Sequence, residues 1–192
     1  MPYQFKFTSP TTDFSCNIET KRCEGINKNG LRCNRRVAIA TPLCFTHLEK
    51  TKQIKIKPST LPDAGKGLFA VNKQKEPNEI IFRQGDTIIP YAGEKNLTNQ
   101  VLTNRYGEYT APYGVQYADN NNEDAACKRG VGSLANRNVG NLNNARLYPN
   151  RRNGSIFLRA TKNIRNNNEI FVPYGRQYRL NEEGVSNQTK FK

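Results

Sequence analysis

Four of the five cysteines and the single histidine fall within residues 16–50, and four of these five side chains have the spacing of metal ligands. Cys23, Cys33, Cys44 and His47 form the pattern C-x9-C-x10-C-x2-H. Three thiolates and one imidazole complete a tetrahedral site with no position open for a substrate, which is typical of structural zinc. We therefore predict that these residues bind zinc, and that the metal stabilises a segment too short and polar to bury much core.

Two alternatives for this segment stay open from the sequence. The cysteines are scattered reduced thiols with His47 at the surface, or Cys16 replaces one ligand at a poorer spacing. An odd number of cysteines, in a chain that begins without an apolar signal segment, argues against a disulfide framework. Basic residues surround the predicted site and either bind phosphate or acidic protein or form a solvated face: Arg22, Lys28, Arg32, Arg35 and Arg36.

Four short motifs farther along the chain combine glycine turns with tyrosine and asparagine. They are residues 64–70 (AGKGLFA), 90–94 (PYAGE), 134–137 (LANR) and 169–175 (EIFVPYG). In this order and at these spacings they resemble the motifs of the SET-domain protein-lysine methyltransferases, over roughly residues 54–180. Each motif alone is weak evidence, whereas four in the right order are specific. The segment around the cysteines is similar to small Cys3His modules of large DNA viruses, which suggests a viral origin.

The resemblance implies transfer of a methyl group from S-adenosylmethionine to a lysine. This is an in-line displacement, so positioning supplies much of the rate. The positive charge of the sulfonium disappears in the transition state, so neutral oxygens near the methyl group suit the reaction better than strong stabilisation of the cation. By resemblance Tyr174 is the catalytic tyrosine and Tyr91 lines the lysine channel. The alternative for both is a tyrosine that only packs in the core.

The resemblance also assigns residues to the cofactor. The turn at Lys66, Gly67 and Leu68 contacts its methionine part, where glycine permits close approach of the backbone. Asn136 matches the asparagine of the family's Asn-His-Ser motif, but Arg137 replaces the histidine. Arg137 either contacts the cofactor or points away. This departure favours a rival interpretation, a catalytically degenerate SET-fold protein that acts as a zinc-containing nucleic-acid or protein binding module.

Two further positions depart from the family. Val172 stands where an aromatic residue often sets the number of methyl groups added, and Asn144 is the nearest match to a Pro-Asn element. The missing aromatic could come from another tyrosine: Tyr106, Tyr109, Tyr113, Tyr117 or Tyr148. Residues 176–179, with Tyr178, are candidates to close the site.

The elements that must position these residues are mostly short strands. Runs rich in Ile, Val, Phe and Tyr recur between turn signals, which predicts a mostly β body. The predicted strands are residues 51–58, 67–71, 80–82, 87–91, 115–118, 155–160 and 169–172, and the best candidate helix is residues 97–106. The resemblance implies a SET-domain (β-clip) fold of several short curled sheets. It also implies a C-terminal pseudoknot in which the segments of Asn136 and Tyr174 pass through one another.

We divide the chain into residues 1–50 with the zinc module, 54–180 as the methyltransferase domain, and 181–192 as a polar tail. Residues 1–15 are expected to be an irregular lead-in. The formal net charge of +14 predicts contact with nucleic acid, or serves solubility alone. It would repel a histone-like substrate, so we expect acidic residues to gather at the peptide groove: Glu94, Asp119, Glu123 and Asp124. The expected location is intracellular and soluble, in a host nucleus or at a viral replication site, with no membrane partner.

Overall fold

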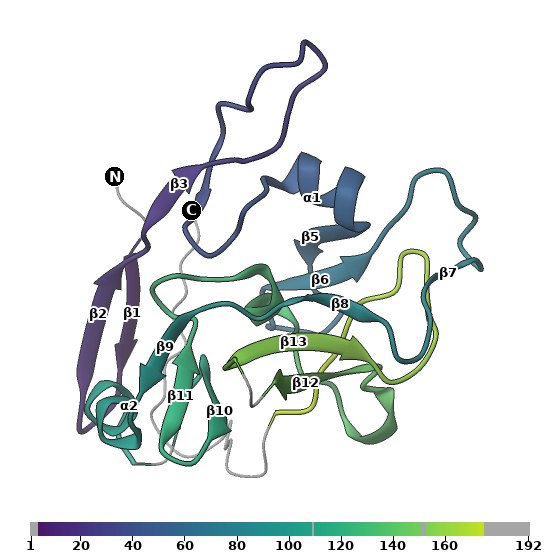
Figure 1. Cartoon of the computed structure of the whole chain (residues 1–192). Coiled ribbons are helices and arrows are strands. Elements are labelled where there is room, and N and C mark those ends of the chain that lie inside the picture. The colour runs from purple at the N-terminus through teal and green to yellow at the C-terminus, as the bar shows by residue number, and fades with distance from the viewer. Residues whose placement is uncertain (1–3, 109, 151–152, 175–192) are drawn as a thin grey trace.

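The computed structural model of the protein describes residues 4–108, 110–150 and 153–174. Within them short strands predominate, arranged in six small sheets (Figure 1). The strands are β1 Gln4–Thr8, β2 Asp13–Asn17, β3 Thr20–Arg22, β4 Arg36–Ala38, β5 Ile54–Pro58, β6 Lys66–Ala70, β7 Ile80–Phe82, β8 Thr87–Pro90, β9 Glu94–Leu97, β10 Gly114–Ala118, β11 Asn121–Asp124, β12 Ala145–Asn150, β13 Ser155–Ala160 and β14 Ile164–Arg165. The helices are α1 Phe45–Lys52 and α2 Asn99–Tyr106, with 3-10 turns at Val131–Leu134 and Gly140–Leu142. The predicted mostly β architecture is confirmed. No helix of the described residues is long and apolar enough to cross a bilayer.

The main core includes buried residues from the sheet with strand order β12-β13-β8. Alternate residues of β13 are buried, because successive side chains of a strand point to opposite faces. Leu158 of β13 lies opposite Leu147 and Ile89 of its two neighbours, and Leu158 is fully buried. The hairpin of β5 and β6 adds Ile54, Leu68 and Ala70 to the same core. Residues far apart in the chain thus form one apolar interior.

The segment Glu169–Val172 is not the regular strand that the sequence predicts. It pairs only through two isolated bridges, Phe69 with Glu169 and Asn136 with Phe171. The amide of Val172 donates to the Asn136 carbonyl over 2.9 Å, while the Phe171 carbonyl accepts from the amides of Asn144 and Ala145. One neighbour is therefore strand β6, and the other is the irregular loop around Asn136. The segment lies against both, which is the proximity that a knot-like crossing requires.

Residues 4–17 form a hairpin, so the expectation of an irregular lead-in is wrong for them. β1 and β2 pair in antiparallel register, and Phe5 and Phe7 of β1 are buried. Phe7 packs edge-on against Tyr106 of α2, with ring centroids 5.2 Å apart. Phe5 and Phe7 are two residues apart, so their side chains point to the same face of the hairpin and form part of a second, smaller core. The polar residues between them are exposed.

Cys16 and Cys127 form a disulfide across 111 residues of sequence. The expectation of no disulfide is therefore wrong for this pair. Cys16 is in β2 and Cys127 follows β11, so the bond ties the N-terminal hairpin to the body. It also removes Cys16 as an alternative metal ligand. The other cysteines, Cys23, Cys33 and Cys44, are free thiols and buried.

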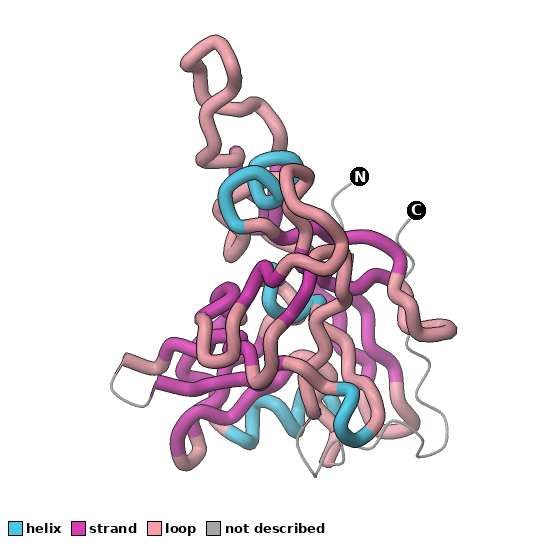
Figure 2. The backbone as a smooth tube through the Cα atoms, turned by 90° about the vertical axis from the view of Figure 1, so that its right-hand side faces the viewer, coloured by secondary structure: helices cyan, strands magenta, loops and turns pink. Residues whose placement is uncertain are grey.

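Residues 20–44 project from the body above the hairpin (Figures 1 and 2). Strands β3 and β4 pair at the base of this projection. Helix α1 follows, and its Leu48 is buried in the main core next to β5. The second helix, α2, begins at its N-cap Thr98, whose hydroxyl accepts from the Val101 amide, so the predicted helix is confirmed from residue 99. The predicted tail 181–192, residues 176–179 and Tyr109 lie outside the described residues.

Candidate functional site

One open cavity of about 1440 Å³ brings together residues from all four sequence motifs. Among the predicted site residues, those that line it are Lys66, Tyr91, Asn136, Arg137 and Tyr174. Pockets for a single drug-sized ligand hold roughly 300–1,000 Å³. The cavity therefore has room for a nucleoside cofactor together with the end of a lysine side chain. Gly67 and Leu68 do not line it: both are buried in β6.

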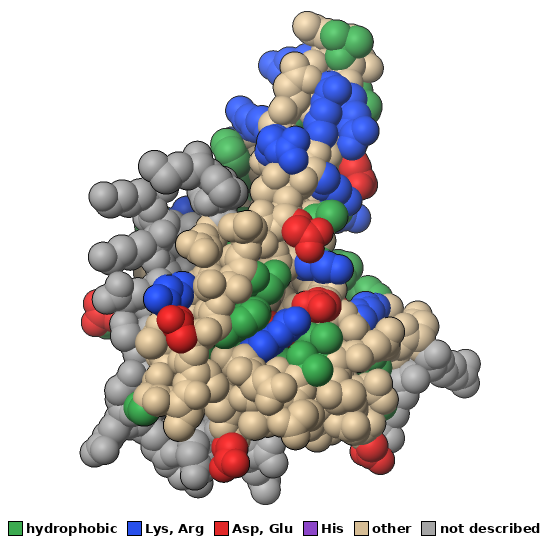
Figure 3. Space-filling model, turned by 90° about the vertical axis from the view of Figure 1, so that its left-hand side faces the viewer, with side chains coloured by type: hydrophobic (Ala, Val, Ile, Leu, Met, Phe, Trp, Pro, Cys, Tyr) green, Lys and Arg blue, Asp and Glu red, His purple; other side chains and the backbone are tan. Residues whose placement is uncertain are grey.

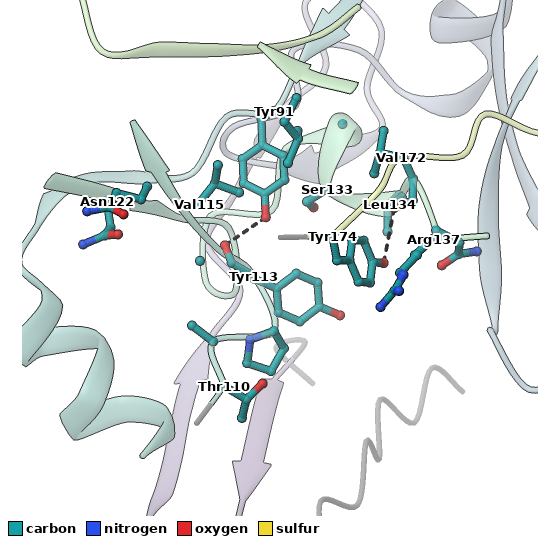
Figure 4. A pocket seen from close by; sticks show the side chains of 18 of the residues that line it. Tyr91, Thr110, Tyr113, Val115, Asn122, Ser133, Leu134, Arg137, Val172 and Tyr174 are labelled. Carbon is teal, nitrogen blue, oxygen red and sulfur yellow. Dashed lines mark hydrogen bonds between the residues drawn. The ribbon is translucent and has the colours of Figure 1, made fainter. Parts of the chain in front are cut away.

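Three tyrosine rings surround one part of this cavity (Figure 4). The hydroxyl of Tyr91 donates to the carbonyl of Tyr113 over 2.9 Å. Burial raises the pKa of Tyr91 well above its ordinary value, so this hydroxyl keeps its proton. Tyr91 follows β8 and Tyr113 precedes β10, and their hydrogen bond joins these two sides of the cavity.

Tyr113 is a lining residue that the sequence could not single out from four other tyrosines. Its ring packs under the guanidinium of Arg129, which lies 4.5 Å from the ring centroid. Arg129 is buried, and a desolvated cation over an aromatic face is a favourable contact. Of the other candidates that the structure describes, Tyr106, Tyr117 and Tyr148 do not line the cavity. The Tyr106 hydroxyl donates to Asp124, and the Tyr117 hydroxyl donates to Asn96.

Tyr174 lies half-buried at the cavity wall, directly after the Glu169–Val172 segment. Its hydroxyl donates to the Ala135 carbonyl over 3.4 Å, a long and therefore weak hydrogen bond. Ala135 is the neighbour of Asn136, and the Val172 amide is bonded to the Asn136 carbonyl. The predicted catalytic tyrosine and the predicted cofactor asparagine are thus held next to one another.

Asn136 is fixed by its side chain. Its Nδ2 donates to the Lys66 carbonyl over 3.1 Å and to Glu169 Oε1 over 3.2 Å. Glu169 is buried, and its carboxylate also accepts from the Ser59 hydroxyl and from the amide and hydroxyl of Thr60. The carboxylate therefore connects its own segment to Ser59 and Thr60 and to the loop of Asn136.

Gly67 has a packing reason to be glycine. A Cβ built on Gly67 would lie 2.0 Å from Glu169 Oε1 and 3.3 Å from Asn136 Nδ2. The glycine permits β6 to run directly against this carboxylate and against the Asn136 side chain. Lys66 and Arg137 are exposed and both line the cavity, so they form part of its rim.

The acidic residues expected at the peptide groove are already used within the fold. Arg105 pairs with Glu94 at 2.9 Å and with Asp124 at 2.8 Å, and Asp124 is fully buried. Glu123 is fully buried and accepts from the Gly93 amide. Burial raises the pKa of Glu123 above its ordinary value. Of the four acids, only Asp119 is exposed. The predicted acidic cluster for a basic substrate is therefore wrong, because three of its members satisfy internal partners.

The four predicted metal ligands converge. The sulfurs of Cys23, Cys33 and Cys44 and one ring nitrogen of His47 all lie within 4.8 Å of one another. His47 Nδ1 is 3.5 Å from Cys23 Sγ and 3.4 Å from Cys44 Sγ. Around tetrahedral zinc with ordinary bond lengths, such N···S edges are about 3.6 Å. The donor set and its spacing fit a zinc ion.

Neighbouring groups orient these ligands. His47 Nε2 lies 2.9 Å from the Ile26 carbonyl, so a proton on Nε2 leaves Nδ1 free to face the sulfurs. Burial raises the pKa of the Cys23 thiol, and the amides of Gly25 and Cys44, which donate to its Sγ, oppose this increase. A Cβ on Gly25 would lie 2.3 Å from His47 Cγ, so only glycine lets the imidazole approach. The cluster therefore has the hydrogen bonds and packing that orient the ligands of a structural metal site.

A family model described as the SET domain matches residues 65–175 of the chain. No curated protein sequence matches it. Among solved structures, ctPRC2 in an autoinhibited conformation bound to S-adenosylmethionine is similar, with a TM-score of 0.51 and 21% identity over 66% of this chain. This chain spans only 16% of that one, and at this identity the likeness shows a shared fold. The methyltransferase domain of human PR domain-containing protein 2 has a TM-score of 0.48 and 20% identity, covering 72% of this chain and 87% of that chain.

Proposed function

The chain belongs to the SET-domain family of lysine methyltransferases, and from this premise we propose that it methylates a lysine in a basic, histone-like protein. S-adenosylmethionine would supply the methyl group. The observation that carries the proposal is the meeting of Tyr174, Asn136 and Tyr91 at one cavity, although they lie in three separate motifs. A protein that had kept only the fold would not need all three at the same cavity.

We assign the cofactor side of the cavity to Asn136, Lys66 and Arg137. The backbone around Asn136 is rigid because its side chain is held by Lys66 and Glu169, so the loop is ready to receive a nucleoside. The two cations at the rim suit the carboxylate of an amino-acid moiety. Gly67 and Leu68 would support this side from β6 through their packing.

We assign the lysine channel to Tyr91, Tyr113 and Tyr174. Their rings exclude water from the amine and hold its carbon chain, and the Tyr174 hydroxyl presents a neutral oxygen close to where the methyl group passes. The single histidine of the chain belongs to the metal cluster, so the lysine would lose its proton to water. In place of the aromatic absent at Val172, Tyr113 would limit the space around the amine.

We also propose that Cys23, Cys33, Cys44 and His47 bind structural zinc. All four ligand positions are filled by protein, so the ion has no place for a substrate. The origin of the protein in a virus, and its place in a cell, stay predictions from the sequence.

The test replaces Tyr174 by phenylalanine. Binding of S-adenosylmethionine is measured by calorimetry, and methyl transfer to mixed histones with radiolabelled cofactor. We expect nearly unchanged binding and a loss of turnover on the order of 100-fold. Tyr117→Phe is the matched control, because it also removes one hydroxyl hydrogen bond but does not line the cavity. Full turnover by Tyr174→Phe would refute the assigned role, and no binding of cofactor by the unmodified protein would favour the degenerate alternative.

A further inference from the structure

Residues 20–53, here called the basic module, hold eight lysines and arginines against two glutamates. The basic residues are Lys21, Arg22, Lys28, Arg32, Arg35, Arg36, Lys50 and Lys52. In the space-filling view, lysine and arginine side chains gather on the part that projects from the body (Figure 3). This surface is separate from the cavity, whose lining includes no residue of the module.

Arg22 of β3 and Arg32 of the loop that follows connect the two sides of the projection. Arg22 donates to the carbonyls of Cys33 and Arg32, and Arg32 donates to the carbonyls of Cys23 and Arg22. The acceptors are neutral carbonyls, so these contacts do not offset the charge of either side chain, and both residues are exposed. Each guanidinium has five N–H groups, so donors remain for another partner.

Two more arginines are held in a similar way. Arg36 donates to the carbonyl and hydroxyl of Thr20. Arg35 donates to the Thr46 hydroxyl and to Cys44 Sγ, while its guanidinium stacks 4.6 Å from the centre of the Phe45 ring. Across the described part of the chain, no carboxylate forms an ion pair with Arg22, Arg32, Arg35 or Arg36. The module thus presents four guanidinium groups that are already held in place by internal contacts. Binding a partner would therefore cost less side-chain entropy.

We propose that the basic module binds the phosphate backbone of a double-helical nucleic acid. A guanidinium fork matches a phosphate bidentately, and charges spread over a projection suit an extended polyanion better than one carboxylate. The apolar side chains between them, Ile26 and Leu31, are 56% and 65% exposed. Apolar side chains flanked by arginine are what a groove of a duplex accepts.

This contact would also solve the like-charge problem of the proposed function. The acids expected to attract a basic substrate are occupied inside the fold, and the chain carries a formal net charge of +14. A nucleic acid that binds both enzyme and substrate would bring them together without an acidic groove. The binding of nucleic acid itself does not depend on methyl transfer.

The experiment measures fluorescence anisotropy of a labelled 20-base-pair DNA duplex, with the full chain, from about 50 to 300 mM KCl. An RNA duplex of the same sequence and a polyglutamate chain are parallel probes. We expect the chain to bind a duplex with an affinity that falls steeply as the salt concentration rises. The duplex with the higher affinity, DNA or RNA, identifies the natural source of the phosphates. Equal or tighter binding of polyglutamate would overturn the proposal in favour of an acidic protein partner.

The variant Lys28→Gln/Arg35→Gln/Arg36→Gln leaves the contacts of Arg22 and Arg32 in place. It should weaken duplex binding at least about tenfold at physiological salt and reduce the salt slope by about one for each phosphate that the variant no longer binds. The control Arg83→Gln/Lys95→Gln/Lys162→Gln removes the same charge from exposed positions on the body. It should change affinity less than about twofold. Both variants must have normal zinc content and melting temperature. If both then weaken binding equally, only net charge matters, and the basic module is not a specific binding surface.

Discussion

The hydroxyl of Tyr91 and the carbonyl of Tyr113 form a 2.9 Å hydrogen bond that joins the end of β8 to the loop before β10. It fixes the loop from which the Tyr113 ring reaches the cavity. In Tyr91→Phe the ring packing persists, but the Tyr113 carbonyl loses one of its two donors and keeps only the Ala125 amide. We expect a decrease of about 1 kcal/mol in free energy of unfolding and about tenfold in turnover. Chemical denaturation and the histone assay measure the two effects, and an unchanged turnover would contradict the positioning role.

Tyr113 should affect how many methyl groups are added. Tyr113→Ala opens space beside the amine, so the product should shift towards higher methylation while the first transfer slows. Mass spectrometry of the methylated peptide resolves the products. Tyr148→Ala removes a tyrosine that does not line the cavity and is the control. An unchanged product distribution in Tyr113→Ala would assign the limit to another residue.

Gly67→Ala should be strongly destabilising. Its Cβ would fall 2.0 Å from Glu169 Oε1, and the carboxylate can move only by giving up hydrogen bonds from Ser59 and Thr60. We expect a cost of at least about 2 kcal/mol. Gly85→Ala meets no atom within 4 Å but has a φ of +94°, so strain alone should cost about 1 kcal/mol there. Equal costs in denaturant titrations would exclude the packing argument.

Removal of the metal should unfold residues 23–44 and leave the body folded. The apolar contacts of this cluster come only from the three cysteines with Val37 and Leu43, which is too little to stabilise it alone. Amide hydrogen exchange before and after chelation should show weaker protection in this segment. Elemental analysis should find one zinc per chain, and none in His47→Ala. Cys16→Ser should keep its zinc, since Cys16 is in the disulfide.

Glu123 should make stability depend on pH. Because burial raises the pKa of its carboxyl, its contribution is fully present below the ordinary carboxyl pKa of 4.5. It is lost as pH rises through the raised value of the folded state. Glu123→Gln removes this titration, so it should be more stable than the unmodified protein at pH 7, by on the order of 1 kcal/mol, and not at pH 4.

Glu94→Gln is the matched control for this titration. The Glu94 carboxylate pairs with Arg105, so its removal should lower stability slightly at pH 7. Thermal melts between pH 4 and pH 8 test both variants. The same pH profile in Glu123→Gln and the unmodified protein would rule out Glu123 as the source.

The sequence predicted several residues that line the cavity, but not the residues that position them. Tyr91, Asn136 and Tyr174, which line one cavity, could be singled out as candidates because each belongs to a short motif whose order along the chain is specific. Glu169 opens one of those motifs, yet its partners Ser59 and Thr60 lie 109 residues or more away and carry no signal. The choice of Tyr113 among five tyrosines likewise depends on tertiary packing.

The errors have local physical causes. The hairpin of β1 and β2 is hard to predict because its apolar residues, Phe5 and Phe7 in one strand and Phe14 and Cys16 in the other, form two short runs among polar residues. The acidic groove was expected from long-range charge alone, whereas Arg105 on α2 attracts Glu94 and Asp124 at contact distance. Cys16 and Cys127 could not be paired from a spacing of 111 residues.

The bond between Cys16 and Cys127 closes a covalent ring that contains the metal cluster, the β5–β6 hairpin and Tyr91. A protease that cuts any one peptide bond between residues 17 and 126 would leave two fragments still joined. Such a nicked chain would migrate as one species until a reductant separates it.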